Sequence, residues 1–141
     1  MNDCVFLDTN VLVYLFDADA PQKQARARAI LEMAAIARRV LLSTQVLQEF
    51  YVSVTRKLAQ PLGPSAAYRA VEDLTAFSIV QIDTLLVLTA IQRHQKEHIS
   101  FWDALIVEAA LAGGATMLYT EDLQHGRIIE GLKVENPFLV G

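Results

Sequence analysis

Four acidic residues stand where predicted strands end or predicted helices begin. They are Asp8 in VFLDTN, Glu49 in STQVLQEF, Asp103 in ISFWDALI and Asp122 in LYTEDL. The segments around them are strongly apolar, so these acids are expected beside the core and not on a solvated charged face. Carboxylates gathered at one edge of a sheet bind hard divalent cations, and such cations support phosphate chemistry. The sequence therefore predicts an acidic metal site.

The donor atoms of these residues narrow the choice of metal. Two carboxylates about 4 Å apart repel each other by about 4 kcal/mol at an effective dielectric near 20, so a cluster of them needs a compensating cation. All the candidate ligands are oxygens, without cysteine or histidine among them. This donor set favours Mg²⁺ or Mn²⁺ over zinc.

Three of the acids also have a purely structural interpretation. Asp8 could cap a helix, although Thr9 and Asn10 could take over that role and free Asp8 to bind a metal. Glu49 could be a solvated helix residue, although apolar residues flank it at helical spacing. Asp103 could stabilise the first turn of its helix. Its helical neighbours are apolar, however, so we expect a partner for it, either a cation or an arginine.

The fourth acid has a close competitor. Asp122 follows Thr120 and Glu121 in a segment that passes from a strand into a turn, where Thr120 could also cap a helix. Periodicity does not decide which of the two acids points inward. We favour Asp122, with Glu121 as the alternative.

A second motif suggests a different metal. His94, Glu97 and His98 in HQKEH match the H-x-x-E-H pattern of zinc peptidases. The neighbouring residues are polar, whereas a catalytic zinc needs a shielded cavity and a third ligand. We therefore interpret this segment as a solvated helix end. The sequence also lacks the glycine-rich phosphate-binding motifs G-x-x-x-x-G-K-[ST] and G-x-G-x-x-G.

The length and composition favour one intracellular domain. A chain of 141 residues fits a single domain, 1–141, with a core that needs no disulfide. Cys4 is the only cysteine, which suits a reducing cytoplasm, and it is expected in a buried strand. The longest apolar runs are too short to span a bilayer, and the first residues do not resemble a signal peptide. We therefore expect a cytoplasmic protein that does not bind membranes.

The chain combines a high apolar content with a negative charge. Hydrophobic residues make up 53% of it and mean hydropathy is +0.30. This excess predicts a dimer interface or a hydrophobic groove for a partner. The net charge of −4 argues against electrostatic coating of nucleic acid, although bound cations would reverse the charge of the acidic site. The basic residues available to a phosphate backbone are Arg26, Arg28, Arg38, Arg39, Arg56, Lys57 and Lys96.

Predicted strands and helices alternate along the chain. Strands are expected over 4–8, 40–43, 78–82 and 116–120, with one more edge strand within 132–138. Helices are expected directly after Asp8 and over 21–39, 44–59, 65–77, 83–98 and 101–112. This alternation predicts an α/β fold with a parallel sheet and helices on both faces. Ligands bind such sheets beyond the carboxyl ends of the strands, where Asp8 and Asp122 are expected.

Taken together, the motifs resemble the PIN-domain family, and most closely the VapC-like ribonuclease toxins of bacterial toxin–antitoxin pairs. The matching segments are VFLDTNVLVYLFD, LSTQVLQEFYVSVTRK, ISFWDALIVEAALAGGA and LYTEDL, in the family's order. The resemblance implies a three-layer α/β/α fold with a central parallel sheet. It also implies an acidic pocket that binds one or two Mg²⁺ or Mn²⁺ ions.

The resemblance further implies residue roles and an activity. Asp8, Glu49, Asp103 and Asp122 fall on the family's acidic positions, with Asn10 and Thr120 on its supporting polar positions. The implied activity is metal-assisted hydrolysis of RNA phosphodiester bonds, with Asp8 and Asp103 as the principal ligands. Glu49 would hold the metal through water or assist proton transfer, and Asp122 would complete a second metal position.

The family also implies partners. It suggests a homodimer and a cognate antitoxin whose tail fills a groove between the early helices. A non-catalytic PIN-like module that binds RNA or a protein is the alternative function. The presence of all four acids favours the enzyme.

Overall fold

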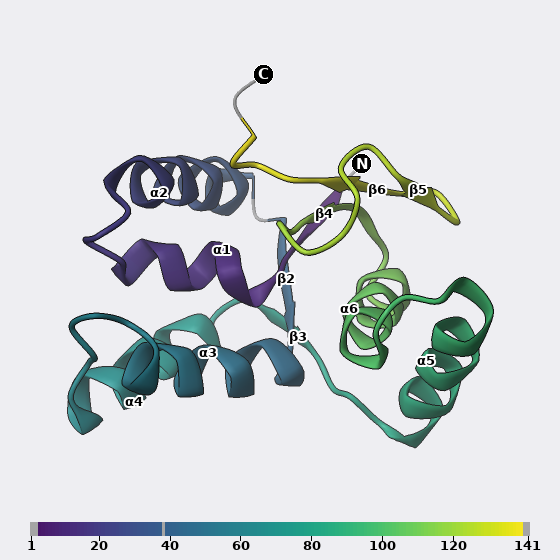
Figure 1. The fold of residues 1–141 in the computed structure, drawn as a ribbon, viewed down its shortest axis with the longest axis horizontal. Coiled ribbons are helices and arrows are strands. Elements are labelled where there is room, and N and C mark those ends of the chain that lie inside the picture. Colours follow the sequence, from purple (N-terminus) through teal and green to yellow (C-terminus); the bar gives the residue numbers. More distant parts are fainter. Residues whose placement is uncertain (1–2, 38, 140–141) are drawn as a thin grey trace.

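A six-stranded sheet runs through the computed structural model, which describes residues 3–37 and 39–139 (Figure 1). The strand order is β3-β2-β1-β4-β6-β5. All neighbouring strands are parallel except β5 and β6. The strands are β1 (Cys4–Leu7), β2 (Val40–Ser43), β3 (Ser78–Val80), β4 (Ala115–Tyr119), β5 (Ile128–Ile129) and β6 (Leu132–Glu135). Arg38, one of the predicted phosphate-binding residues, lies outside the described residues.

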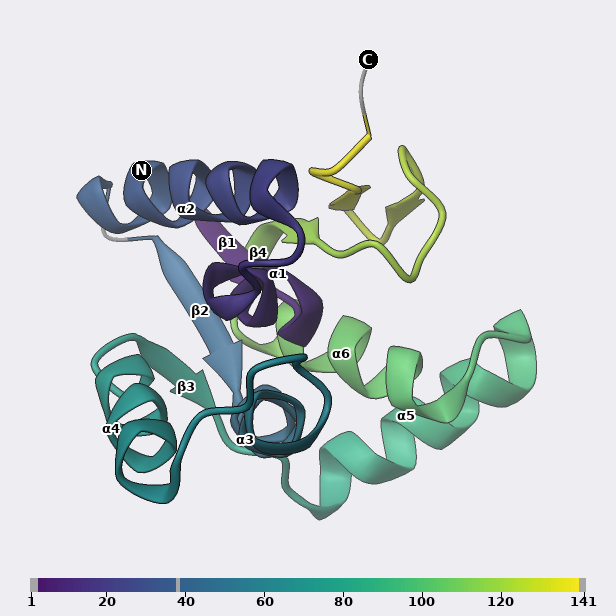
Figure 2. The ribbon, with the colours of Figure 1, turned by 60° about the vertical axis from the view of Figure 1, so that its left-hand side comes forward.

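Helices cover both faces of this sheet. One face carries α1 (Thr9–Val13) with the 3₁₀ turn η1 (Tyr14–Phe16), α2 (Pro21–Ile36), α3 (Thr44–Arg56) and α4 (Pro64–Leu74). The other face carries α5 (Thr84–Glu97) and α6 (Phe101–Ala112). Figures 1 and 2 show the two groups of helices on opposite sides of the strands. The predicted three-layer α/β/α fold with a central, mostly parallel sheet is confirmed.

The order of the strands explains both this layering and the place of a binding site. The chain moves outward from β1 to β2 and β3, then returns past β1 to β4. Right-handed crossovers that run in opposite directions place their helices on opposite faces. The direction changes between β1 and β4, and a crevice opens at such a point beyond the carboxyl ends of the strands. Asp8 follows β1 and Asp122 lies just beyond β4.

Capping residues set the starts of the main helices. The Ser43 hydroxyl accepts a hydrogen bond from the Val46 backbone at the start of α3, and the Ser100 hydroxyl accepts one from Asp103 at the start of α6. Serine is a favoured residue at this position of a helix. The predicted helices over 21–39 and 44–59 run past the observed ends, which are at Ile36 and Arg56.

The core lies between the sheet and its two layers of helices. Phe6, Leu7 and Leu42 from the strands are fully buried, as are Phe50 of α3 and Val107 of α6. Every residue of α6 from Ala104 to Ala110 is buried, so this helix is apolar almost all round. In the described residues, none of the helices is both long and apolar enough to cross a membrane.

Two expectations about the strands are wrong. Leu132–Glu135 is not the edge strand, because β5 pairs with it on the outside in antiparallel register. The connection is a two-residue turn of Glu130 and Gly131, both with positive φ (48° and 88°), as type I′ hairpins require. Cys4 begins β1 but is only partly buried.

Candidate active site

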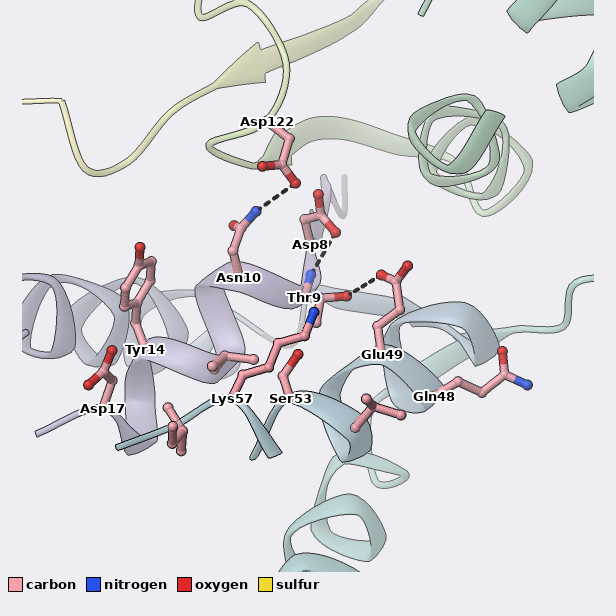
Figure 3. Close-up of a pocket in the computed structure, with 13 residues that line it drawn as sticks. Asp8, Thr9, Asn10, Tyr14, Asp17, Gln48, Glu49, Ser53, Lys57 and Asp122 are labelled. Carbon is pink, nitrogen blue, oxygen red and sulfur yellow. Dashed lines mark hydrogen bonds between the residues drawn. The ribbon is translucent and has the colours of Figure 1, made fainter. Parts of the chain in front are cut away.

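A cavity of about 620 Å³ lies between α1, α3 and the segment that follows β4 (Figure 3). Three of the predicted acids line it, namely Asp8, Glu49 and Asp122. Their carboxylates lie toward one end of the cavity, with Asn10 and Thr9 between them (Figure 3). The cavity is therefore acidic and lies at the crevice that the strand order predicts.

Asp8 is the most buried of these acids, with 4% of its surface exposed. Its Oδ1 accepts a hydrogen bond from the Thr9 backbone at 2.7 Å, and its Oδ2 accepts one from the Thr120 hydroxyl at 2.7 Å. Asp8 therefore caps α1 itself, contrary to the expectation that Thr9 and Asn10 would replace it. Each of its oxygens still has a lone pair for a metal.

Burial raises the pKa of Asp8 to about 7. The hydrogen bonds from Thr120 and Thr9 act in the opposite direction, while the Asp122 and Glu49 carboxylates raise the pKa further. Without a cation, Asp8 is thus close to half-protonated near neutral pH. A bound cation would favour the charged form.

Glu49 is held from two sides at the cavity wall. Its Oε1 accepts a hydrogen bond from the Thr9 hydroxyl at 2.8 Å, and its Oε2 accepts one from the Gln45 amide at 3.2 Å. Gln45 lies one helical turn earlier on α3 and is buried. These two bonds turn Glu49 toward Asp8 and leave it half-buried at the cavity wall, so it is not a fully solvated helix residue.

Asp122 is oriented by Asn10 and Thr120. Its Oδ2 accepts a hydrogen bond from Asn10 at 3.1 Å, and its backbone N–H donates to the Thr120 hydroxyl at 3.1 Å. Thr120 caps no helix, and it joins Asp122 to Asp8 because its hydroxyl serves both. Burial raises the pKa of Asp122, with further contributions from the Asp103 and Glu121 carboxylates.

Glu121, the alternative to Asp122, is occupied elsewhere. Its Oε1 accepts a hydrogen bond from the Tyr14 hydroxyl at 2.7 Å, and its Oε2 pairs with Lys23 at 3.1 Å. Lys23 also donates to the Tyr14 hydroxyl at 3.0 Å and lies over the ring of Phe138. Glu121 therefore points toward Tyr14 and Lys23, whereas its neighbour Asp122 points into the cavity. Sequence reasoning assigned no role to Tyr14 or Lys23. Tyr14 stands within the matching segment VFLDTNVLVYLFD, but nothing in the segment points to a contact with Glu121, and Lys23 belongs to no motif.

Asp103 lies in the first turn of α6 and does not line the cavity. It is nevertheless close enough to act on the other acids. Burial raises its pKa, and the Glu49 carboxylate raises it further, while Asp103 in turn raises the pKa of Asp122. In the described part of the chain, Asp103 forms no ion pair with an arginine, so that expected partner is not found.

The donor set fits a hard cation. The cavity offers carboxylate oxygens, and Asn10 Oδ1 is buried without a hydrogen-bond partner, so one acceptor is left over beside them. Among residues 3–37 and 39–139, no three acidic, histidine or cysteine side chains lie close enough to form a preformed metal cage. This arrangement suits Mg²⁺, which usually retains several waters and takes only one or two carboxylate ligands from the protein.

The H-x-x-E-H segment is engaged in other contacts. Glu97 pairs with Arg93 on its own helix and with Arg127 at 2.8 Å. His94 contacts the Ile99 carbonyl, and His98 caps α5 with a left-handed backbone (φ 59°). Since Glu97 is held by two arginines, the geometry does not support the zinc-peptidase interpretation.

Comparison with known families decides the relationship. The model of the PIN domain matches residues 5–130. The chain belongs to the PIN domain family. A search of curated proteins with the sequence gives no match.

This PIN domain also resembles solved structures. A chain of a toxin–antitoxin complex from Klebsiella pneumoniae superposes with a TM-score of 0.71 at 22% identity, covering 96% of this chain and 99% of that one. Mycobacterium tuberculosis VapC20, a toxin that cleaves the sarcin-ricin loop, gives 0.65 at 24% identity, covering 84% and 89%. A chain of Rickettsia felis VapBC2 bound to promoter DNA gives 0.66 at 19%, covering 94% and 98%. At these identities the likeness shows a shared fold.

Proposed function

We propose that this PIN domain is a metal-dependent endoribonuclease and the toxin of a toxin–antitoxin pair. One observation carries the proposal, namely that three carboxylates from separate segments line one cavity at the switch point of the sheet, with a fourth acid beside it. Asp8, Glu49 and Asp122 line one cavity, and Asp103 raises the pKa of Asp122 from beside it. Among the described side chains, none of these four acids forms an ion pair with an arginine or a lysine. A divalent cation would balance them.

Asp8, Glu49, Asp103 and Asp122 would hold the Mg²⁺ or Mn²⁺. A bound ion would supply Lewis-acid activation of water and neutralise charge on the phosphate. Thr9 and Thr120 hold Glu49 and Asp8 in place by hydrogen bonds of 2.8 Å and 2.7 Å. Glu49 has a lone pair free to accept a proton, and Asn10 aligns Asp122.

Lys57 would contact the phosphate backbone. It is the basic side chain among the described residues that line the cavity, and it extends toward the end that holds Glu49 and Thr9 (Figure 3). A lysine there offsets part of the repulsion between an acidic cavity and RNA.

The toxin assignment rests on the relatives. The Klebsiella pneumoniae structure is a toxin–antitoxin complex, and VapC20 is a toxin that cleaves the sarcin-ricin loop. The Rickettsia felis structure is VapBC2 bound to promoter DNA. We propose that this chain likewise forms a homodimer, acts on RNA in the cytoplasm and is inhibited by an antitoxin. The wall of the cavity formed by Val13, Val52 and Leu58 would receive an apolar part of that partner.

An assay on RNA tests the proposal. The purified chain, free of any partner, is incubated with structured RNAs in Mg²⁺ or Mn²⁺, and with EDTA. Cleavage is expected with metal, to be lost in EDTA, and to fall at least 100-fold in Asp8→Asn and Asp103→Asn. Asp73→Asn, an exposed acid on α4, is the matched control and should cleave normally. Undiminished cleavage by the Asp8→Asn/Asp103→Asn double variant would contradict the proposal.

The missing cage gives the binding-module alternative a specific basis. Because no three of these acids form a preformed metal cage among the described residues, a module that binds RNA without cutting it is the second candidate. Thermal shift in Mg²⁺ or Mn²⁺ and an RNA-binding assay run beside the cleavage assay distinguish the two. Metal-dependent stabilisation and RNA binding without cleavage of any RNA would favour the module.

A further inference from the structure

Trp102 exposes an unusually large aromatic surface next to the acidic site. It is the second residue of α6, directly before Asp103, and 61% of its side chain is exposed. A buried tryptophan would contribute strongly to folding, but this one leaves most of its ring in water. We propose that the Trp102 ring is a stacking platform for an unpaired nucleobase of the RNA. This inference rests on the proposed function and adds a substrate subsite to it.

The backbone of Trp102 is tied to the carboxylate site. One nitrogen, Gln45 Nε2, donates to the Glu49 carboxylate and to the Trp102 carbonyl, each at 3.2 Å. Gln45 itself is buried, with 5% exposed, so it is a rigid link. A base stacked on Trp102 would therefore belong to a nucleotide close to the phosphodiester that the acids address.

The ring of Trp102 is supported on one side. Phe101 meets it edge-on, with ring centroids 5.1 Å apart and an angle of 70° between the planes. Phe101 in turn packs against the small core cluster of Ala90, Ala104 and Leu105. A supported ring loses little conformational entropy when a base stacks on it, which favours binding.

Stacking would also let a negatively charged protein bind RNA without strong attraction for phosphate. The chain carries a net charge of −4, and acids line the cavity, so a general attraction for phosphate is weak. Base–aromatic stacking needs no charge and accepts any base, and proteins that recognise unpaired RNA use it widely. The chemistry of the site thus matches a splayed-out base of a loop better than a base-paired stem.

Fluorescence tests the subsite without catalysis, because Trp102 is the only tryptophan. The Asp8→Asn protein with Mg²⁺, and the wild-type protein in EDTA, are titrated with a 12-nucleotide single-stranded RNA that carries a 3′ dye. Saturable quenching of tryptophan emission is expected, and an oligomer of the same length with abasic riboses should not quench. RNA that binds by dye anisotropy while tryptophan emission stays unchanged would overturn the subsite.

Variants give a second, kinetic readout. Trp102→Ala is expected to raise KM for RNA about tenfold with kcat changed less than threefold, and Trp102→Phe should stay within threefold of the wild type. Tyr68→Ala, which removes a similarly exposed aromatic (69%) from α4, is the matched control and should leave KM unchanged. Circular dichroism checks that each variant is folded. Normal KM in Trp102→Ala would overturn the subsite and leave the proposed function intact.

Two further outcomes separate the rival explanations. If Trp102→Ala loses a dimer in sedimentation while KM is unchanged, the ring is a contact between subunits and the subsite is wrong. If the wild-type protein neither binds nor cleaves RNA, the proposed function fails and the subsite fails with it.

Discussion

The molecule gathers carboxylates in two places and treats them in opposite ways. Around Arg93, the carboxylates of Glu97, Glu108 and Glu130 all accept hydrogen bonds from one guanidinium group, and Arg127 adds a second cation. In the cavity, the acids are held by hydroxyl, amide and backbone groups that carry no charge. In the first group every carboxylate is paired with an arginine and one net negative charge is left over. The acids of the cavity have no such pairing among the described residues, so a bound cation is needed to neutralise them.

This difference distinguishes acids that hold the fold together from the acids that we propose to bind a metal. The Arg93 group joins α5 and α6 to the turn between β5 and β6, and its members Arg93 and Glu108 expose only 10% and 9% of their side chains. Burial acts to lower the pKa of Arg93, but its bonds to Glu108 and Glu130 raise it overall. In the cavity, burial raises the pKa of Asp8 and Asp122 instead. Unbalanced burial of like charges marks the site.

The largest effect is expected when the Arg93 group loses its cation. Arg93→Met leaves Glu108 buried without a partner, so the free energy of unfolding should fall by about 3 to 5 kcal/mol in urea denaturation. The rate of RNA cleavage per folded molecule should not change. Arg93→Met combined with Glu108→Leu should recover most of the stability, because a buried ion pair can be replaced by apolar residues. An Arg93→Met protein as stable as the wild type would show that the Arg93 group does not stabilise the fold, and would contradict the contrast with the cavity.

The opposite sign is expected at Asp8 in metal-free protein. Its folded-state pKa of about 7 lies above the ordinary value of 3.8, so the folded form binds a proton more tightly. The stability that this proton contributes is complete below about pH 4 and is lost as pH rises toward 7 and beyond. Asp8→Asn removes the charge, so it should stabilise the protein by about 2 to 4 kcal/mol at pH 8 and hardly at all at pH 4.

Urea denaturation in EDTA at pH 4, 6 and 8 measures this trend. Asp73→Asn on the surface of α4 serves as the control and should show no such dependence. An Asp8→Asn variant that is less stable than the wild type at pH 8 would show that the charge at this position is balanced within the protein.

A smaller effect is expected at Lys57, which lies at the C-terminal end of α3 and lines the same cavity as the acids. Lys57→Gln should raise KM for RNA about threefold to tenfold and reduce the slope of log KM against log salt by about 1, as for the loss of one phosphate contact. Arg69→Gln, an exposed basic residue on α4 outside the cavity lining, is the control. Equal salt slopes in the two variants would remove Lys57 from the substrate path.

The smallest effect on cleavage is expected at Glu121. Because Tyr14 and Lys23 already bind it, Glu121→Gln should change kcat less than threefold, whereas Asp122→Asn should lower it at least tenfold. The two residues are neighbours, so the pair of variants is a matched test of which acid serves the site. A greater loss in Glu121→Gln would reverse the assignment.

The fold could be predicted well from the sequence because the residues that start and end its helices are recognisable from their immediate neighbours. Ser43 and Ser100 cap helices directly before the predicted starts at 44 and 101, and Gly113 and Gly114 follow the end of α6. The short strand β5 was missed because two residues carry no periodicity, and because its turn is Glu-Gly and not the more recognisable Asn-Gly. Alternation of strands and helices was sufficient for the layers, but not for the last hairpin.

The candidate site was predicted in part, for a physical reason. Strand ends place Asp8 and Asp122 at one edge of a parallel sheet, so their meeting followed from topology. Glu121 contacts Tyr14 and Lys23, which are 107 and 98 positions away in the sequence. No local sequence pattern predicts contacts of this range. The same is true of Arg93, whose role as a buried cation depends on side chains from two other segments, Glu108 on α6 and Glu130 in the turn between β5 and β6.

The bonds that shape the cavity span most of the chain, and this has a kinetic meaning. Thr120 with Asp8 and Asn10 with Asp122 each close a separation of 112 residues, and Thr9 with Glu49 closes one of 40. Closing such long loops is entropically costly and comes late, after the elements that bring the ends together. No fragment of the sheet can hold the four acids, so the proposed nuclease activity and the global fold should appear and disappear in one cooperative transition.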